Sequence, residues 1–273
     1  MNKKKIAILG CGNIGSAIAN GLVNSGLYKP SQIFVTRKSH EQLDKFSQKG
    51  FLTSSNNLEA VKKSEIIIIA VTPQQLDDLL LEINDELIEN KHILLSVVTG
   101  AAINQIKSKL TKKIPVVRVM PNTAIAIQES MTCISSHEED NNALEIAKYI
   151  FDQLGSTIVI HEELMVPATA LCASGIAFFL RAIRAASQGG IEIGFHAEDA
   201  LFMASQTAKG AASLILKSGA HPEGEVDKVT TPMGITISGL NQMEHAGFSS
   251  SLIKGIVTSA EKAKHLYSQK KED

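Results

Sequence analysis

Short apolar runs alternate with amphipathic segments through the first half of the chain. The runs are rich in Ile and Val and are bounded by glycine, proline or polar residues, a pattern typical of buried strands. Residues 13–25 have the apolar periodicity of a helix, and Gly26 stands where that helix would end. Alternation of this kind predicts an α/β fold in which helices cover both faces of a doubly wound parallel sheet. The expected strands are Ile6–Leu9, Ile33–Val35, Ile66–Val71, Ile93–Val98 and Val116–Val119.

The second half of the chain has almost no strand pattern. It is rich in Ala, Ser, Gly and Leu, and helical periodicity covers Met165–Ser187, Ala197–Lys217 and Ser249–Tyr267. Small residues between positions 170 and 177 would let neighbouring helices approach closely. We therefore predict an α/β domain at residues 1–163 and an all-helical domain at residues 164–273.

Composition and charge narrow the classes of partner. Of 273 residues 44% are hydrophobic, enough for two domains with cores. The 27 basic and 28 acidic side chains leave a formal charge of −1, so no broad field would attract nucleic acid or an anionic membrane. The apolar runs at residues 6–9 and 66–71 are too short to span a bilayer.

The spacing of the three cysteines indicates the redox state of the compartment. Cys11, Cys133 and Cys172 are widely spaced and form no C-x-x-C pair, as expected in a reduced compartment. We expect a cytoplasmic protein without nucleic-acid or membrane partners.

A glycine motif, Gly10-Cys11-Gly12-Asn13-Ile14-Gly15, follows the first predicted strand and opens the first helix. In a Rossmann-type sheet Gly10 would make the tight turn, and Gly12 would let the backbone approach a pyrophosphate. Gly15 would allow the helix to pack closely on the strand, and the helix N-terminus would supply N–H groups to phosphates. A plain glycine turn is the alternative, but a strand before the motif and a helix after it favour dinucleotide binding.

The end of the second predicted strand bears on which dinucleotide binds. An NAD site usually has a carboxylate there, whereas this chain has Thr36, Arg37, Lys38 and Ser39. Basic side chains and hydroxyl groups suit a 2′-phosphate, so NADP(H) is favoured over NAD(H). The alternative is that Arg37 and Lys38 are a solvated loop pair.

Motifs for other chemistry are absent from the sequence. It contains neither G-x-S-x-G nor H-E-x-x-H, and its histidines do not fall at metal-ligand spacing, so we expect no metal and a redox cofactor. One polar segment, residues 227–236, clusters threonines around Pro232 and Gly234. Thr231 suits an N-cap and Pro232 a first helical position, which would turn the amides near Met233 and Gly234 toward an anion. From the residues alone, a capped helix start without a ligand is the simpler interpretation.

Five segments carry a resemblance that covers nearly the whole chain. The most specific reads D-K-V-T-T-P at residues 227–232, within His221–Leu240. Together the segments resemble the pyrroline-5-carboxylate reductase family. They are the glycine turn with Asn13, Ala70–Gln74, Arg118–Thr123, Gln206–Ala212 and His221–Leu240.

The resemblance implies NADPH-dependent reduction of the cyclic imine 1-pyrroline-5-carboxylate to L-proline, the last step of proline biosynthesis. It places the substrate carboxylate on the Thr231 hydroxyl and on amides near Met233 and Gly234. It places the Thr236 hydroxyl at the imine nitrogen, so Thr231 and Thr236 are the implied catalytic residues. An iminium carbon is already electrophilic, so an enzyme of this kind mainly has to position two molecules.

The resemblance also implies the rest of the cofactor site and the assembly. The helical domain would be an oligomerisation domain that interlocks with a second copy, giving a homo-oligomer built from dimers. The motifs above already assign the cofactor to the glycine turn (residues 10, 12 and 13–15) and to residues 36–38. The resemblance adds Asn57, Ala70, Val71, Thr72, Pro73, Thr99, Pro121 and Asn122.

The chain departs from the family pattern at several positions. Thr72 replaces a common Lys, Met233 replaces a glycine, and Ala173 and Ile176 alter a small-residue stretch. A side chain at position 233 would narrow the carboxylate pocket or occupy a backbone angle that suits glycine. Two alternatives follow: a related reductase for another cyclic imine or small oxo acid, and a sensor that binds NADP without catalysis.

Overall fold

The computed structural model describes residues 4–264, which fall into two compact units. The first unit runs to Ser174 and takes up the chain again from Ser259, and the second is Gly175–Thr258. The first unit extends past the boundary predicted at residue 163 because Met165 is fully buried against Met120 and Cys133.

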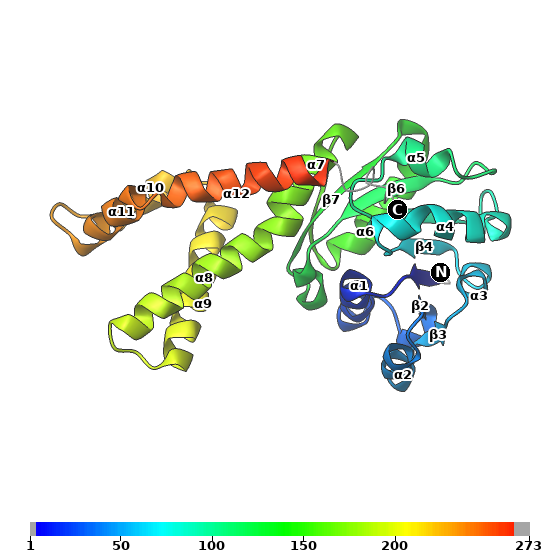
Figure 1. Cartoon of the computed structure of the whole chain (residues 1–273), viewed down its shortest axis with the longest axis horizontal. Coiled ribbons are helices and arrows are strands. Elements are labelled where there is room, and N and C mark those ends of the chain that lie inside the picture. The colour runs from blue at the N-terminus through cyan, green and yellow to red at the C-terminus, as the bar shows by residue number, and fades with distance from the viewer. Residues whose placement is uncertain (1–3, 265–273) are drawn as a thin grey trace, which may run out of the picture. The chain divides into compact units, whose positions relative to one another are not determined.

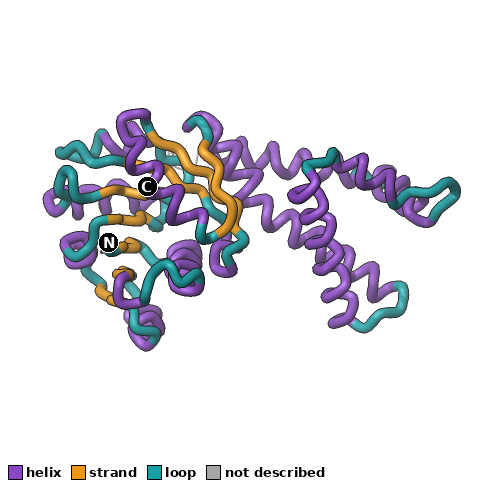
Figure 2. Tube along the Cα trace, turned by 180° about the vertical axis from the view of Figure 1, so that it is seen from behind, coloured by secondary structure: helices purple, strands orange, loops and turns teal. Residues whose placement is uncertain are grey.

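An eight-stranded sheet in the order β3-β2-β1-β4-β5-β6-β7-β8 forms the centre of the first unit (Figure 2). Neighbouring strands are parallel except β6 and β7, which are antiparallel. The strands are β1 (Ile6–Leu9), β2 (Ile33–Thr36), β3 (Leu52–Ser54), β4 (Ile66–Ile69), β5 (Ile93–Ser96), β6 (Val116–Met120), β7 (Ser130–Ser136) and β8 (Gly155–Val159).

The predicted doubly wound fold is confirmed, and the five predicted strands are β1, β2, β4, β5 and β6. Two of them end earlier than predicted, β4 at Ile69 and β5 at Ser96, because the chain turns toward the next helix there. Sequence reasoning missed β3, β7 and β8. These strands carry polar or half-exposed residues, so they lack the continuous apolar pattern of the buried strands.

Each face of the sheet has its own hydrophobic core. Alternate residues of β1 point to opposite faces, Ile6 and Ile8 to one core and Ala7 and Leu9 to the other. Helices α1, α2 and α6 contribute to the first core and α3, α4 and α5 to the second (Figure 1). Their bounds are α1 (Asn13–Asn24), α2 (His40–Gln48), α3 (Asn57–Lys62), α4 (Pro73–Ile83), α5 (Ile103–Lys107) and α6 (Asn141–Asp152).

The strand order reverses between β1 and β4. The chain moves outward from β1 through β2 to β3, and then β4 returns to the other side of β1. Loops at the carboxyl ends of β1 and β4 therefore separate, because the next helices cover opposite faces. Open α/β sheets bind ligands in the crevice at such a reversal.

The described part of the second unit is helical. The long pattern predicted over Met165–Ser187 is interrupted at the boundary between the units: α7 (Met165–Ala168) and a π-helix at Thr169–Ser174 belong to the first unit, and α8 (Gly175–Glu192) begins the second. The remaining helices are α9 (Ala197–Ser218), α10 (Pro222–Lys228), α11 (Ile235–His245) and α12 (Phe248–Ala263). The predicted helix over Ser249–Tyr267 is α12, and its predicted end lies outside the described residues.

Many large apolar side chains of the second unit face solvent. Phe179, Phe202 and Leu216 are 61%, 71% and 85% exposed. Among residues 4–264, one helical stretch, Glu162–Glu192, has the length and composition to cross a membrane, and 22% of its most apolar window is buried. The two apolar runs that are too short to span a bilayer, residues 6–9 and 66–71, lie outside this stretch.

Candidate functional site

The glycine turn links β1 to α1 and lies at the strand reversal. Gly10 has a φ of +82°, and a Cβ there would lie 2.4 Å from Cγ1 of Val71, so the tight turn needs glycine. A Cβ on Gly15 would lie 3.2 Å from the Gly10 carbonyl oxygen, which agrees with the predicted close packing of helix on strand. A Cβ on Gly12 would meet nothing within 4 Å. The backbone at Gly12 is therefore open to an approaching ligand.

The first turn of α1 provides donors at this place. Gly12 is its N-cap residue, and no side chain among the described residues caps the turn. Its first N–H groups have no partner within the helix, so together with the helix dipole they favour an anion. Burial raises the pKa of the Cys11 thiol to about 11, so the side chain within the turn stays neutral and would not repel a phosphate.

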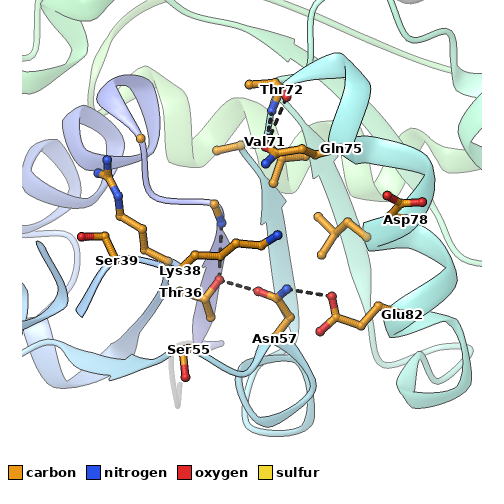
Figure 3. A pocket seen from close by; sticks show the side chains of 15 residues that line it. Thr36, Lys38, Ser39, Ser55, Asn57, Val71, Thr72, Gln75, Asp78 and Glu82 are labelled. Carbon is orange, nitrogen blue, oxygen red and sulfur yellow. Dashed lines mark hydrogen bonds between the residues drawn. The ribbon is translucent and has the colours of Figure 1, made fainter. Parts of the chain in front are cut away.

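A cleft of about 510 Å³ opens beside the turn (Figure 3). Loops after β1, β2 and β4 form one side of it, and α4 forms another. Its lining includes most of the residues predicted to bind the cofactor. These are Gly10, Gly12, Thr36, Arg37, Lys38, Asn57, Ala70, Val71 and Thr72.

A hydrogen-bond chain holds the end of β2 in place. The buried Thr36 hydroxyl accepts from the Gly10 N–H at 3.3 Å and donates to Oδ1 of Asn57 at 2.6 Å. Nδ2 of Asn57 donates to the Glu82 carboxylate on α4 at 3.0 Å (Figure 3). The chain of hydrogen bonds therefore brings together two of the predicted cofactor-binding residues, Thr36 and Asn57, and connects them to the glycine turn.

The basic side chains after β2 border the cleft. Nη1 of Arg37 donates to the Cys11 carbonyl at 2.7 Å, which holds the guanidinium beside the glycine turn. Lys38 extends across the cleft toward α4, whereas the Ser39 hydroxyl stays on the opposite side, away from α4 (Figure 3). Two cations and hydroxyl groups next to free N–H groups fit a ligand that carries several phosphates.

One face of α4 belongs to the cleft and was missed by sequence reasoning. Gln75, Asp78, Leu79 and Glu82 line it. Their spacing of three and four residues marks one helical face, a signal that the sequence contains. Thr72 also has a local role, because its hydroxyl and its N–H both contact Oε1 of Gln75 at the start of α4.

The other predicted cofactor residues lie outside the lining of this cleft. Asn13, Ile14 and Gly15 begin α1, and Pro73 begins α4. Thr99 follows β5, and Pro121 and Asn122 follow β6, the next strands along the sheet after β4. Their roles stay predictions.

Asn122 is held from several directions. Its Oδ1 accepts from the Ala124 N–H at 3.0 Å, and its own N–H donates to the Ser130 hydroxyl at 3.2 Å. Its Nδ2 donates to the Cys172 carbonyl at 3.2 Å. The loop after β6 is therefore fixed to β7 and to the π-helix.

The threonine-rich segment lies in the second unit, and its local structure differs from the prediction. The expected helix start at Thr231 and Pro232 is wrong: α11 begins at Ile235, with Gly234 as its N-cap. Instead, the Gly234 N–H donates to the Thr231 carbonyl at 2.9 Å, closing a turn with Pro232 at its second position. A Pro there and a positive φ at the next residue are features of a type II turn.

Met233 occupies the turn position that favours glycine. Its φ is +57°, and its side chain is fully exposed, so it does not fill a pocket in this unit. A Cβ on Gly234 would lie 2.6 Å from Oγ1 of Thr231, so the Thr231 hydroxyl sits beside the N-terminus of α11. Thr236 lies in the first turn of the same helix. The turn thus gathers Thr231, Gly234 and Thr236 at one helix end.

The described residues contain no group of three or more His, Cys, Asp or Glu side chains that would hold a metal ion. Donors in the two regions are instead backbone amides, hydroxyls and, beside the glycine turn, basic side chains. Such donors bind phosphate and carboxylate groups.

Comparisons with known proteins cover both units. Residues 5–100 match the family described as NADP oxidoreductase coenzyme F420-dependent, and residues 162–266 match the family described as pyrroline-5-carboxylate reductase dimerisation. The chain is 51% identical to pyrroline-5-carboxylate reductase 2 of Dictyostelium discoideum, over 96% of this chain and 93% of that protein.

Two further matches agree. Pyrroline-5-carboxylate reductase 1 of Dictyostelium discoideum is 56% identical over 98% of this chain, which spans only 51% of that longer protein. The structure of the Plasmodium falciparum pyrroline carboxylate reductase with NADP bound is 26% identical, covers 98% of this chain and 99% of its own, and has a TM-score of 0.89. The resemblance in the sequence motifs is thereby confirmed, and the chain belongs to the pyrroline-5-carboxylate reductase family.

Proposed function

We propose that this protein reduces 1-pyrroline-5-carboxylate to L-proline with NADPH, as the last step of proline biosynthesis. The observation that carries the proposal is the 51% identity to a named reductase over 93% of that reductase's length. The open glycine turn and the hydroxyl-rich turn before α11 support it, because they supply donors for a dinucleotide and for a small carboxylate.

NADP(H) is the proposed cofactor, and NAD(H) is less favoured. The residues fit the group: Gly12 leaves space for the pyrophosphate, and the N–H groups of α1 face it. Arg37, Lys38 and Ser39 would hold the 2′-phosphate. Acidic Asp78 and Glu82 lie on the α4 side, where Glu82 is already engaged by Asn57. When bound, the reduced nicotinamide supplies a hydride to the imine carbon.

The substrate carboxylate would lie at the N-terminus of α11. The Thr231 hydroxyl and the amides at Met233 and Gly234 would bind it, and the Thr236 hydroxyl would contact the imine nitrogen. A protonated imine needs no strong acid from the protein, so positioning is the main task of these residues. The nicotinamide would extend toward Thr99, Pro121 and Asn122.

We further propose that the helical unit pairs with a second copy to form interlocked dimers. The match to a dimerisation family and the exposed apolar side chains of α8 and α9 support this assembly. The α8 part of the apolar stretch Glu162–Glu192 would then pack on protein, not lipid, and its Arg181 and Arg184 fit that role better than a bilayer interior. A cytoplasmic location remains part of the proposal.

The test is proline formation from NADPH and 1-pyrroline-5-carboxylate, followed by loss of absorbance of the reduced cofactor and by detection of proline. Purified protein should turn over, and Thr231→Ala and Thr236→Val should each lower kcat/KM while NADPH affinity stays unchanged. Faster reduction of a six-membered imine acid or an oxo acid would favour the related reductase. Folded protein that binds NADPH without turnover on any of these substrates would favour the sensor and refute the proposed function.

A further inference from the structure

Two cysteines that are distant in the sequence meet in the first unit. Cys133 lies on β7, and Cys172 lies in the π-helix Thr169–Ser174. Their sulfur atoms are 3.8 Å apart, and the Cys133 thiol donates a hydrogen bond to the Cys172 sulfur. Neither side chain has a part in the proposed reduction.

The two thiols differ in access. Cys133 is 3% exposed and belongs to a small apolar cluster with Met120 and Met165. Cys172 packs at the border of this cluster and is partly exposed. Cys172 is therefore the more open of the two side chains to a small reagent in solution.

The two thiols also differ in acidity. The hydrogen bond from Cys133 lowers the pKa of the Cys172 thiol to about 7 against the opposing effect of burial. The same hydrogen bond, together with burial, raises the pKa of Cys133. An accessible thiolate beside a buried, protonated thiol is the arrangement of an attacking and a resolving cysteine.

We propose that Cys133 and Cys172 form a redox-active dithiol, which a low-molecular-weight disulfide converts into an intrachain disulfide. In the first step the Cys172 thiolate attacks the disulfide, forms a mixed disulfide and releases one thiolate. In the second step the sulfur of Cys133 attacks Sγ of Cys172, and the Cys133 proton passes to the departing sulfur, which leaves as a second thiol. The two protein sulfurs are oxidised, and the reagent disulfide is reduced to two thiols.

The geometry makes the second step a small movement. The sulfur atoms must close from 3.8 Å to the bond length of about 2.05 Å. Cys172 lies in a π-helix, a helical form that often occurs at functional sites. Its carbonyl accepts the Asn122 hydrogen bond, so the disulfide would form one hydrogen bond away from the loop after β6.

Cys11 provides an internal comparison. It is fully buried, and burial raises its pKa to about 11, so it stays protonated at pH 7. Cys172 has the lower pKa and the more open position, so it should react with the reagent well before Cys11 does.

The experiment treats the full-length reduced protein with oxidised glutathione at pH 7, then alkylates it and measures intact and peptide masses. The wild type and Cys11→Ala should each lose two alkylatable thiols, carry no glutathione, and yield a peptide pair joined through Cys133 and Cys172. Cys133→Ala should stop at a glutathione adduct on Cys172, and Cys172→Ala should keep its thiols. Full reversal by a dithiol reductant is expected.

Three results would overturn the proposal. One is a lasting glutathione adduct on wild-type Cys172, which would mean that Cys133 does not resolve it. Another is a disulfide between chains, seen as a dimer on a non-reducing gel. The third is an unchanged number of thiols in excess reagent. Because the readout is mass and not turnover, it does not depend on whether the proposed reduction is correct.

Discussion

Gly12→Ala should weaken cofactor binding without changing the stability of the fold, so it is the most informative single substitution. Its φ of −78° and ψ of −152° lie in the extended region, which alanine also adopts. The added methyl group would meet no atom within 4 Å. The free energy of unfolding should therefore change by no more than about 0.5 kcal/mol.

Cofactor binding should respond much more strongly. The methyl group would project into the space that we assign to the pyrophosphate, and it would force at least one backbone N–H away from a phosphate oxygen. A hydrogen bond to a charged group contributes about 1.5–3 kcal/mol. Since about 1.4 kcal/mol corresponds to a factor of ten, the NADPH Kd should rise by about 10-fold to 150-fold.

The assay measures the NADPH Kd by calorimetry and the Tm by thermal unfolding without cofactor. Gly189→Ala is the matched control, because a Cβ there also meets nothing within 4 Å and Gly189 lies on α8, outside the cleft lining. It should leave the Kd unchanged. Gly10→Ala should instead lower the Tm, because of its φ of +82° and the contact with Val71. Wild-type NADPH affinity in Gly12→Ala would refute the assignment of the pyrophosphate to this turn.

Three further predictions concern folding and assembly. Met233→Gly should raise the free energy of unfolding by up to about 1 kcal/mol, because a φ of +57° is less costly for glycine than for Met233. Denaturant titration measures the change, and a lower stability would contradict this reasoning. Gly155→Ala should lower the free energy of unfolding by at least about 3 kcal/mol in the same titration, because a Cβ there would overlap the backbone of Ser130. A decrease of less than about 1 kcal/mol would contradict the register of β7 and β8. Gly12→Glu and Thr236→Val should each turn over far more slowly than the wild type when alone, yet regain about a quarter of wild-type turnover when co-refolded if each site uses both chains of a dimer. No recovery in verified hybrids would indicate sites within one chain.

The central part of the fold could be predicted from the sequence. Strands β1, β2, β4, β5 and β6 are buried on both faces, so continuous Ile and Val runs marked them. The turn at Gly10 could also be predicted, because a glycine motif between a strand and a helix is typical of dinucleotide binding. These features depend on residues close together in the chain.

Features that depend on distant contacts could not be predicted in this way. β7 has polar residues such as Ser130 and Thr132, whose hydroxyls pair with each other, and the Ser130 hydroxyl also accepts from the N–H of Asn122 in the loop after β6. The π-helix interrupts a continuous apolar pattern, and its pairing of Cys172 with Cys133 joins residues on different elements. Pattern reasoning treated Thr231 and Pro232 as a helix start, but the positive φ of Met233 delays α11 to Ile235.

The most direct test of the central claim follows the transferred atom. NADPH that carries deuterium at the reactive position of the nicotinamide is mixed with purified protein and unlabelled 1-pyrroline-5-carboxylate, and the proline formed is analysed by mass spectrometry. The proposed function predicts proline with one deuterium at the former imine carbon, at a rate that falls in Thr231→Ala and Gly12→Ala. Unlabelled proline, or no proline from folded protein that binds NADPH, would contradict it.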